Sequence, residues 1–292
     1  MSFSSDQKQK IISDQYKNMC CRKALLSGIL SVKASVSNEN VSFSLEKSEY
    51  CDFAAKLISE FYGKTAKIES PKSGGRCKII SFDSKAAVKY IKTLSEDTLP
   101  FLSKCPACAS AYMKGVFLAC GTISDPQKQY LIEFSPSVNA KLLATVLSEY
   151  SFDVQSTIRR EKHVLYFKKA AVIEDLCGFI GLTDAMFSIT NTQIEREFLN
   201  NTNRIVNCET NNIGKSVSAS AKQIDAIKAL DEHNLLSSLP EELEYTARVR
   251  LQNDTLSLSQ LSKIFTPPIS KSGLSHRLSK IIEMSEQLLN GK

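Results

Sequence analysis

Apolar and polar positions follow two different periods along the first two thirds of the chain. Residues 41–47 and 129–135 form short apolar runs with polar interruptions, which predicts strands. Residues 50–63 and 138–151 repeat their apolar positions every three or four residues, which predicts amphipathic helices. Each helix is followed by two more strand-like runs and then by an apolar helical run, at residues 84–94 and 169–181. The same order of elements therefore occurs twice.

The start of each copy carries residue identities as well as a pattern. Residues 21–37 can be laid over residues 108–124 without a gap, and cysteine, alanine, glycine and serine positions then coincide. We therefore predict an α+β fold in which one αβαββα unit is duplicated with pseudo-twofold symmetry. The repeats cover about residues 20–95 and 107–182, within a domain of residues 1–195.

Small residues mark the helix that begins each repeat. Gly115, Ala119 and Gly121 recur at near-helical spacing, which leaves backbone accessible and lets two helices approach closely. Residues 113–121, with 26–34 as their copy, resemble the LAGLIDADG helix of homing endonucleases. The resemblance implies that the two helices pack at the domain centre and that two antiparallel sheets form a saddle over the DNA major groove.

Nuclease chemistry in that family needs a carboxylate near the C-terminal end of each helix to hold a divalent metal ion. The corresponding positions are Lys33 and Cys120, and neither is a hard oxygen ligand. Asp125 lies nearby, but it precedes Pro126 and is first a turn signal. We therefore expect no catalytic residues and no nuclease activity.

The chain changes character after residue 195. Residues 196–221 are rich in asparagine and serine, which compete for backbone hydrogen bonds and cannot fill a core, so they predict a linker. An alternative role for Asn203 and Arg204 is contact with DNA phosphate or with the neighbouring domain.

Helical patterns fill the remaining domain, residues 222–292. Pro267 and Pro268 interrupt helix, and Ser270 is a suitable cap for the helix that follows. Apolar residues at helical spacing on both sides predict a helix-turn-helix over residues 257–281, with a turn at 266–270. The side chains that we expect to contact DNA are Ser259, Lys271, Ser272, Ser275, His276, Arg277 and Lys280, with Arg277 suited to guanine.

The charge distribution adds a second candidate surface. The net charge is +6, and positive residues cluster in residues 64–92 and in residues 248–280, a pattern that fits a polyanion or a solvated basic face. The predicted strands of the large domain would also place cations on a sheet surface. The candidate contacts to the DNA backbone there are Arg76, Lys78, Arg159, Arg160 and Lys162.

Nine cysteines in a chain without an apolar export signal favour reduced thiols over disulfides. Cys105 and Cys108 have the C-x-x-C spacing of zinc ligands, with Cys20, Cys21 and Cys120 as further candidates, but a second spaced pair is missing. We therefore expect neither a metal site nor a cofactor. The absence of a long apolar run leads us to expect a cytoplasmic, nucleoid-associated protein without a membrane partner.

Taken together, the chain resembles the WhiA family of bacterial transcription regulators, in which a degenerate LAGLIDADG domain precedes a helix-turn-helix. The resemblance rests on residues 20–30, 105–126, 201–212 and 257–278. Residues 105–112 depart from it, because an arginine-rich stretch is common there in relatives.

The resemblance implies a sequence-specific, non-enzymatic DNA-binding protein linked to sporulation, cell division or chromosome segregation. It implies double-stranded DNA as the partner, with another transcription regulator or RNA polymerase as further candidates and no small-molecule substrate. Two alternatives stay open, a divergent homing endonuclease and a scaffold whose large domain binds a protein.

Overall fold

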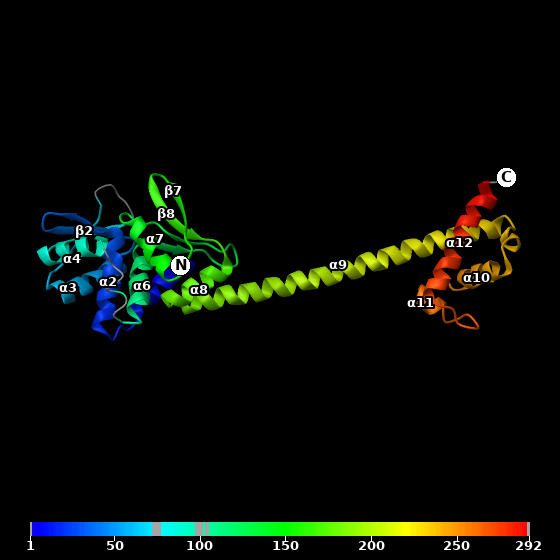
Figure 1. Ribbon diagram of the computed structural model, residues 1–292, viewed down its shortest axis with the longest axis horizontal. Coiled ribbons are helices and arrows are strands. Elements are labelled where there is room, and N and C mark those ends of the chain that lie inside the picture. The colour runs from blue at the N-terminus through cyan, green and yellow to red at the C-terminus, as the bar shows by residue number, and fades with distance from the viewer. Residues whose placement is uncertain (1, 72–76, 97–101, 103–104, 291–292) are drawn as a thin grey trace. The chain divides into compact units, whose positions relative to one another are not determined.

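The computed structural model describes residues 2–71, 77–96, 102 and 105–290 (Figure 1). The chain divides into two compact units, Met1–Glu197 and Phe198–Lys292, and we describe each by itself. None of the helices in the described ranges is both long enough and apolar enough to cross a membrane.

Unit 1 begins with α1 (Phe3–Ser13) and then contains two copies of one motif. The first copy consists of α2 (Met19–Lys33), β1 (Ser35–Ser37), β2 (Asn40–Leu45), α3 (Ser48–Tyr62), β3 (Lys67–Glu69), β4 (Lys78–Asp83) and α4 (Lys85–Glu96). The second consists of α6 (Cys108–Cys120), β5 (Gly121–Ile123), β6 (Ile132–Phe134), α7 (Ala140–Glu149), β7 (Gln155–Arg159), β8 (Lys162–Phe167) and α8 (Ala170–Ile180).

The two copies have the same topology, which confirms the predicted duplication. Each forms a four-stranded antiparallel sheet, in the order β1-β2-β4-β3 and β5-β6-β8-β7. Each also contains one strand more than the predicted αβαββα order, because β1 and β5 are three-residue strands that follow α2 and α6 almost directly. Strands this short give too few residues for an alternating pattern.

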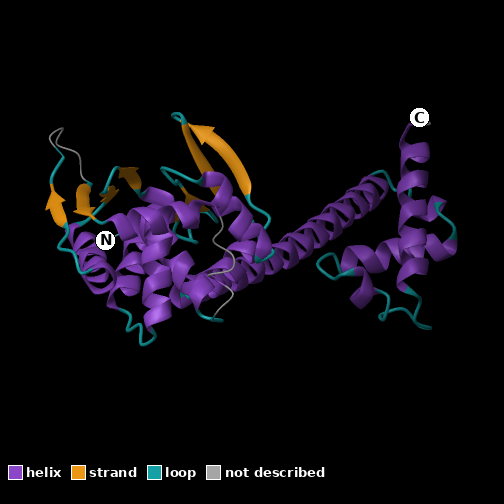
Figure 2. Cartoon of the chain, turned by 60° about the vertical axis from the view of Figure 1, so that its left-hand side comes forward, coloured by secondary structure: helices purple, strands orange, loops and turns teal. Residues whose placement is uncertain are grey.

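One face of each sheet packs on helices and the other face is open. In β2 the side chains of Val41, Phe43 and Leu45 are buried, whereas the residues between them are only half-buried. Phe43 pairs with Ile80 across the first sheet, and its neighbours on that face complete an apolar layer. Figure 2 shows the strands of unit 1 gathered on one side of its helices. The open faces are therefore the surfaces that correspond to the predicted saddle.

Helices α2 and α6 pack against each other at the centre of unit 1 (Figure 1). A Cβ atom on Gly28 would overlap the carbonyl oxygen of Tyr112, and a Cβ atom on Gly115 would overlap the carbonyl oxygen of Leu25. The two contacts are equivalent under the repeat, because each glycine meets the other helix three residues before that helix's own glycine. The predicted close approach is confirmed, and it needs glycine at both positions.

Helix α9 begins in unit 1 and continues into unit 2. Helix α9 runs from Thr183 to Glu232 without a break and passes through residues 196–221, so the segment predicted as an Asn-rich linker is helical. Its side chains from residue 197 to residue 219 are exposed, so its asparagines meet water and are not required to fill a core. Asparagine lowers helix propensity without abolishing it, which explains why composition alone predicted a linker.

The rest of unit 2 is a small helical domain with its own core. After a 3-10 turn (Leu236–Ser238) come α10 (Glu241–Gln252), α11 (Leu258–Leu261) and α12 (Lys271–Asn290). Apolar side chains from each of these helices and from the end of α9 form one buried cluster, which includes Ile227, Leu243, Leu261, Leu274 and Leu278. This core orients α12.

Candidate nucleic-acid interface

The first turns of α12 have one buried face and one polar face. Leu274, Leu278 and Ile281 are completely buried and anchor the helix on the core of unit 2. The side chains predicted to contact DNA lie mostly on the other faces of the helix, since residues three and four apart share a face. The exposed ones are Lys271, Ser272, Ser275, His276 and Lys280.

Local hydrogen bonds define where the two helices of the helix-turn-helix begin. The Ser270 hydroxyl accepts a hydrogen bond from the Gly273 amide at 3.0 Å, which confirms Ser270 as a cap for α12. Ser257 and Gln260 form a reciprocal capping box at the start of α11. Ser259, the remaining predicted contact in this element, is exposed on α11.

The connection between these helices is longer than the predicted turn at residues 266–270. Helix α11 ends at Leu261, and a turn begins at once, so residues 262–270 join it to α12. The Ile269 amide donates to the Ser262 carbonyl at 3.2 Å and closes this loop. Phe265 is buried within it, edge-on to Tyr245 of α10 at 5.7 Å between ring centroids. Its apolar residues therefore belong to a packed loop, although their spacing resembles that of a helix.

Arg277 is placed differently from its neighbours on α12. Its Nη2 forms an ion pair with the Glu242 carboxylate of α10, and 25% of its side chain is exposed. The guanidinium is therefore turned toward α10, away from the exposed serines and His276. Contact between Arg277 and guanine stays a prediction, and it requires the arginine to exchange or share its carboxylate partner.

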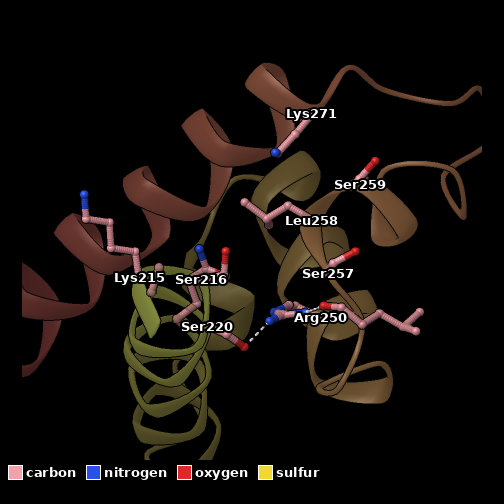
Figure 3. Close-up of a pocket in the computed structure, with 11 residues that line it drawn as sticks. Lys215, Ser216, Ser220, Arg250, Ser257, Leu258, Ser259 and Lys271 are labelled. Carbon is pink, nitrogen blue, oxygen red and sulfur yellow. Dashed lines mark hydrogen bonds between the residues drawn. The ribbon is translucent and has the colours of Figure 1, made fainter. Parts of the chain in front are cut away.

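A cleft of about 260 Å³ lies beside the start of α12 within unit 2 (Figure 3). Lys215 and Ser216 of α9, Ser257 and Ser259 around α11, and Lys271 of α12 contribute to its lining. Ammonium groups and serine hydroxyls are the groups that bind phosphate oxygens in protein–DNA complexes. The cleft extends the polar surface of α12 toward α9.

Arg250 lines this cleft, but its side chain is buried, whereas its charge would suggest an exposed cation. Its side chain is 1% exposed, its Nη1 donates to the carbonyls of Asn253 at 3.2 Å and Leu256 at 2.7 Å, and its Nη2 donates to the Ser220 hydroxyl. Figure 3 shows Arg250 extending from α10 to Ser220. Arg250 therefore holds the loop after α10 against α9. The burial of Arg250 could have been predicted from its position, because it follows Leu243 by seven residues and so lies on the same, buried face of α10.

The cations predicted on the sheets of unit 1 are only partly available. Arg159 forms an ion pair with Glu133 at 2.7 Å, and the ammonium of Lys78 donates to the Ser70 hydroxyl at 2.6 Å. Arg160 and Lys162 are exposed at the hairpin between β7 and β8, where Arg160 and Glu161 have positive φ angles of 49° and 63°. Arg76 lies outside the described residues. Asn203 and Arg204 are exposed on α9, and all these contacts to phosphate stay predictions.

The C-terminal ends of α2 and α6 carry the two groups that replace the carboxylates of nucleases. Cys120 is buried, which raises the pKa of its thiol to about 12, so the group is uncharged near neutral pH. The positive charges of Lys33 and Lys8 lower the pKa of this thiol, but by less than burial raises it. The predicted turn at Asp125 is confirmed, because its Oδ1 accepts a hydrogen bond from the Gln127 amide at 3.0 Å. This end of the helix pair offers lysines and a neutral thiol, which suit divalent metal poorly.

Four of the five cysteines weighed as zinc ligands, all except Cys120, lie together at the opposite ends of α2 and α6. The Sγ atoms of Cys20, Cys21, Cys105 and Cys108 all lie within 4.8 Å of one another. We expected no metal site because a second spaced pair is missing, but the second pair is formed by the adjacent Cys20 and Cys21 in the first repeat. The coincidence of Cys21 and Cys108 in the repeat alignment is the feature of the sequence that places the two pairs together.

Comparisons with known proteins agree with both units. The family model described as the WhiA LAGLIDADG-like domain matches residues 109–199. The model described as the WhiA C-terminal HTH domain matches residues 202–285.

Whole-chain relatives match over nearly their full length. The probable cell division protein WhiA of Caldicellulosiruptor saccharolyticus is 32% identical over 316 residues, which covers 100% of this chain and 97% of the relative. That of Clostridium novyi is 32% identical over 314 residues, covering 99% and 98%. Full-length WhiA from Thermotoga maritima shares the fold with a TM-score of 0.62 and 23% identity, over 98% of this chain and 99% of the other. The chain belongs to the WhiA family.

Proposed function

We propose that this chain is a sequence-specific DNA-binding transcription regulator that reads DNA with α12. The main support for this proposal is the exposed polar face of α12. Leu274 and Leu278 anchor its opposite face in the core, and Ser270 caps its start. In the major groove, Ser272, Ser275 and His276 would face base edges. Lys271 and Lys280 would neutralise phosphates on either side.

The cleft beside α12 supplies a path for the DNA backbone in this proposal. Lys215 and Lys271 carry its exposed positive charge, and Ser257 and Ser259 add hydroxyl donors. Phosphate contacts of this kind set register and orientation, whereas the exposed face of α12 supplies base recognition.

Unit 1 contributes affinity without sequence preference in this proposal. Of the cations predicted on its sheets, Arg160 and Lys162 lie exposed at a hairpin tip, and their contact with the sugar–phosphate backbone would be sequence-tolerant. The double variant Arg160→Ala/Lys162→Ala should therefore weaken binding to target and scrambled duplexes by the same factor and reduce the salt dependence.

We also propose that the protein does not cut DNA. The positions that correspond to metal-binding carboxylates hold Lys33 and the buried thiol of Cys120, and Asp125 is engaged in its turn. Incubation with target DNA in Mg²⁺ or Mn²⁺ should leave the duplex intact. Site-specific cleavage that scales with protein concentration would support a divergent homing endonuclease instead.

The names of the relatives suggest which cellular process the protein regulates. Those of Caldicellulosiruptor saccharolyticus and Clostridium novyi are called probable cell division proteins. We propose that the regulated genes act in cell division, with sporulation and chromosome segregation as the wider expectation. Another transcription regulator or RNA polymerase would then be the protein partner.

The decisive experiment begins with chromatin immunoprecipitation and sequencing of the full chain to obtain a target motif. Fluorescence anisotropy then compares His276→Ala with His233→Ala, since both histidines are exposed in unit 2 but only His276 lies on α12. We expect His276→Ala to lose about 1–3 kcal/mol of binding free energy on the target and far less on scrambled duplex. His233→Ala should behave as wild type.

A second pair of variants separates phosphate contact from base reading. Lys280→Ala should weaken target and scrambled duplexes alike and flatten the salt dependence, and Lys228→Ala on α9 is the matched exposed control. Equal behaviour of all four variants, or the absence of any enriched motif, would remove α12 as the reading element. The large domain would then have to be tested for a protein partner.

A further inference from the structure

A four-thiol cluster joins the two repeats of unit 1. Cys20 and Cys21 lie in the first turn of α2, Cys108 is the first residue of α6, and Cys105 lies just before it. Their four Sγ atoms lie within 4.8 Å of one another. The first repeat contributes two thiols, the second repeat with the residues just before it contributes the other two, and Cys21 and Cys108 are equivalent under the repeat offset.

The spacing of the sulfur atoms fits one tetrahedral metal ion. With Zn–S bonds of about 2.3 Å, neighbouring sulfurs of a tetrahedron lie about 3.8 Å apart, so small side-chain movements close the observed group around zinc. A polynuclear iron–sulfur cluster shares its cysteines among several irons and holds them further apart. The donor set of four cysteines is that of structural zinc sites.

Disulfides explain the arrangement less well. Cys20 and Cys21 are adjacent in a helix, so they cannot bond to each other with ordinary disulfide geometry. A disulfide between the Cys20–Cys21 pair and the Cys105–Cys108 pair would use one thiol from each. It would not explain why the other two thiols lie equally close. Convergence of all four is what a metal ion requires.

Two opposing effects act on these thiols: burial raises the pKa of Cys21 and Cys108, whereas the two helix N-termini favour thiolate. The N-terminal ends of both α2 and α6 lie here, and neither helix has an acidic residue in its first turn. Backbone amides at helix N-termini stabilise thiolates. Cys21 and Cys108 are buried, Cys105 is half-buried and Cys20 is exposed, so the group is closed on one side and reachable from solvent on the other.

We propose that Cys20, Cys21, Cys105 and Cys108 bind one Zn²⁺ that joins the N-terminal ends of α2 and α6. All four positions of the metal are taken by protein sulfur, so the site is structural and has no open position for a substrate. It joins the repeats across the pseudo-twofold axis, at the end of the helix pair opposite Lys33 and Cys120. The proposal is independent of the DNA-binding function of unit 2.

Metal content of the full chain is the first test. Protein purified without chelator should contain about one zinc per chain by inductively coupled plasma mass spectrometry. Cys20→Ser should lose the zinc, whereas Cys208→Ser, which changes another exposed cysteine, should retain it. Because Cys20 is exposed, its replacement by serine removes no core packing, and circular dichroism will verify the fold.

Two further readouts distinguish zinc from its competitors. The Co²⁺-substituted chain should show the intense visible absorption and sulfur-to-cobalt charge-transfer bands of tetrahedral thiolate, and Cys105→Ser, like Cys20→Ser, should lose them. A strong chelator should lower the thermal midpoint of wild type and of Cys208→Ser, but not that of Cys20→Ser.

Several outcomes would overturn the proposal. One is a metal-free chain whose thermal midpoint does not respond to added Zn²⁺. Another is the recovery of iron and sulfide in place of zinc. A third is a disulfide among these four cysteines in anaerobically alkylated protein.

Discussion

Two helix pairs, α2–α6 in unit 1 and α10–α12 in unit 2, are held together by different parts of the chain. In the first pair, main chain meets main chain, because Gly28 and Gly115 leave room for the carbonyls of Tyr112 and Leu25. In the second pair, side chains fill the space between the helices, with Leu274 and Leu278 in the core and an ion pair at its edge. The α2–α6 pair has no room for a larger side chain at either glycine, whereas the α10–α12 pair depends on large apolar side chains that fill its core.

The same contrast separates structural helices from helices that are available to a ligand. Almost the whole of α6 is buried, so few of its side chains are left to contact anything outside unit 1. Only one face of α12 is buried, and its other face is polar and exposed. A close-packed pair can organise a domain, but recognition needs a helix that is anchored on one side only.

The largest effect is expected from a methyl group added at the α2–α6 contact. Gly28→Ala should cost about 3 kcal/mol or more of unfolding free energy, because the new Cβ overlaps a main-chain carbonyl that cannot move independently of α6. Gly115→Ala should have an equal effect by symmetry. Denaturant unfolding followed by circular dichroism measures both.

Gly214→Ala is the matched control for this pair of variants. Gly214 lies in α9 with nothing within 4 Å of an added Cβ, so alanine should stabilise the helix by about 0.5–1 kcal/mol. Similar effects at all three glycines would mean that main-chain contact does not hold α2 and α6 together.

In unit 2 the matching experiment removes atoms. Leu274→Ala should destabilise unit 2 by about 2–5 kcal/mol, because it leaves a cavity between α12 and the rest of the core. Ser275→Ala, one residue along on the exposed face, should change stability by less than about 0.5 kcal/mol. Amide exchange of α10 and α12, read by mass spectrometry, reports the loss within unit 2, and protected amides in Leu274→Ala would contradict it.

A hydrogen bond between side chains makes a smaller contribution to the α2–α6 pair. Tyr112 of α6 is buried, and its hydroxyl lies 2.8 Å from the Ser31 hydroxyl of α2. Tyr112→Phe removes this hydrogen bond but leaves Ser31 bonded to the Gly28 carbonyl, so we expect a loss of about 0.5–1.5 kcal/mol. The exposed Tyr245→Phe serves as control and should unfold as wild type does. A loss as large as that of Gly28→Ala would make the hydroxyl pair the dominant contact.

The smallest effect concerns the ion pair of the second helix pair. A double-mutant cycle of Arg277→Ala and Glu242→Gln should give a coupling energy of about 0.2–1 kcal/mol in unfolding, because both side chains reach solvent. The exposed Arg248–Glu244 pair within α10 provides a reference cycle. Zero coupling, together with a base-specific loss of DNA affinity in Arg277→Ala, would return Arg277 to base recognition.

The duplicated fold was accessible from sequence because its signals are local and occur twice. Gly28 and Gly115 coincide in the repeat alignment and mark the place where the helices touch, and Ser270 marks the start of α12 by its position after two prolines. Such signals depend only on neighbouring residues. They identify elements, and the repeat supplies their order.

The site was less accessible, because charge does not reveal a partner. Arg159, Arg250 and Arg277 read as free cations in the sequence, but each is engaged by a carboxylate, carbonyl or hydroxyl that lies many residues away or across a loop. The cysteine group likewise combines two pairs from different repeats. Long-range pairing of this kind is a property of the folded chain and leaves no periodic trace.

The continuous α9 also has a consequence for motion within the helix itself. From residue 197 to residue 219 its side chains are exposed, so only backbone hydrogen bonds and weak i,i+4 contacts oppose helix–coil fluctuation there. The asparagines of this stretch add a further cost of roughly 0.7 kcal/mol each relative to alanine. Its amides will therefore exchange with solvent deuterium long before those of α2 or α6, by local opening that leaves both cores folded.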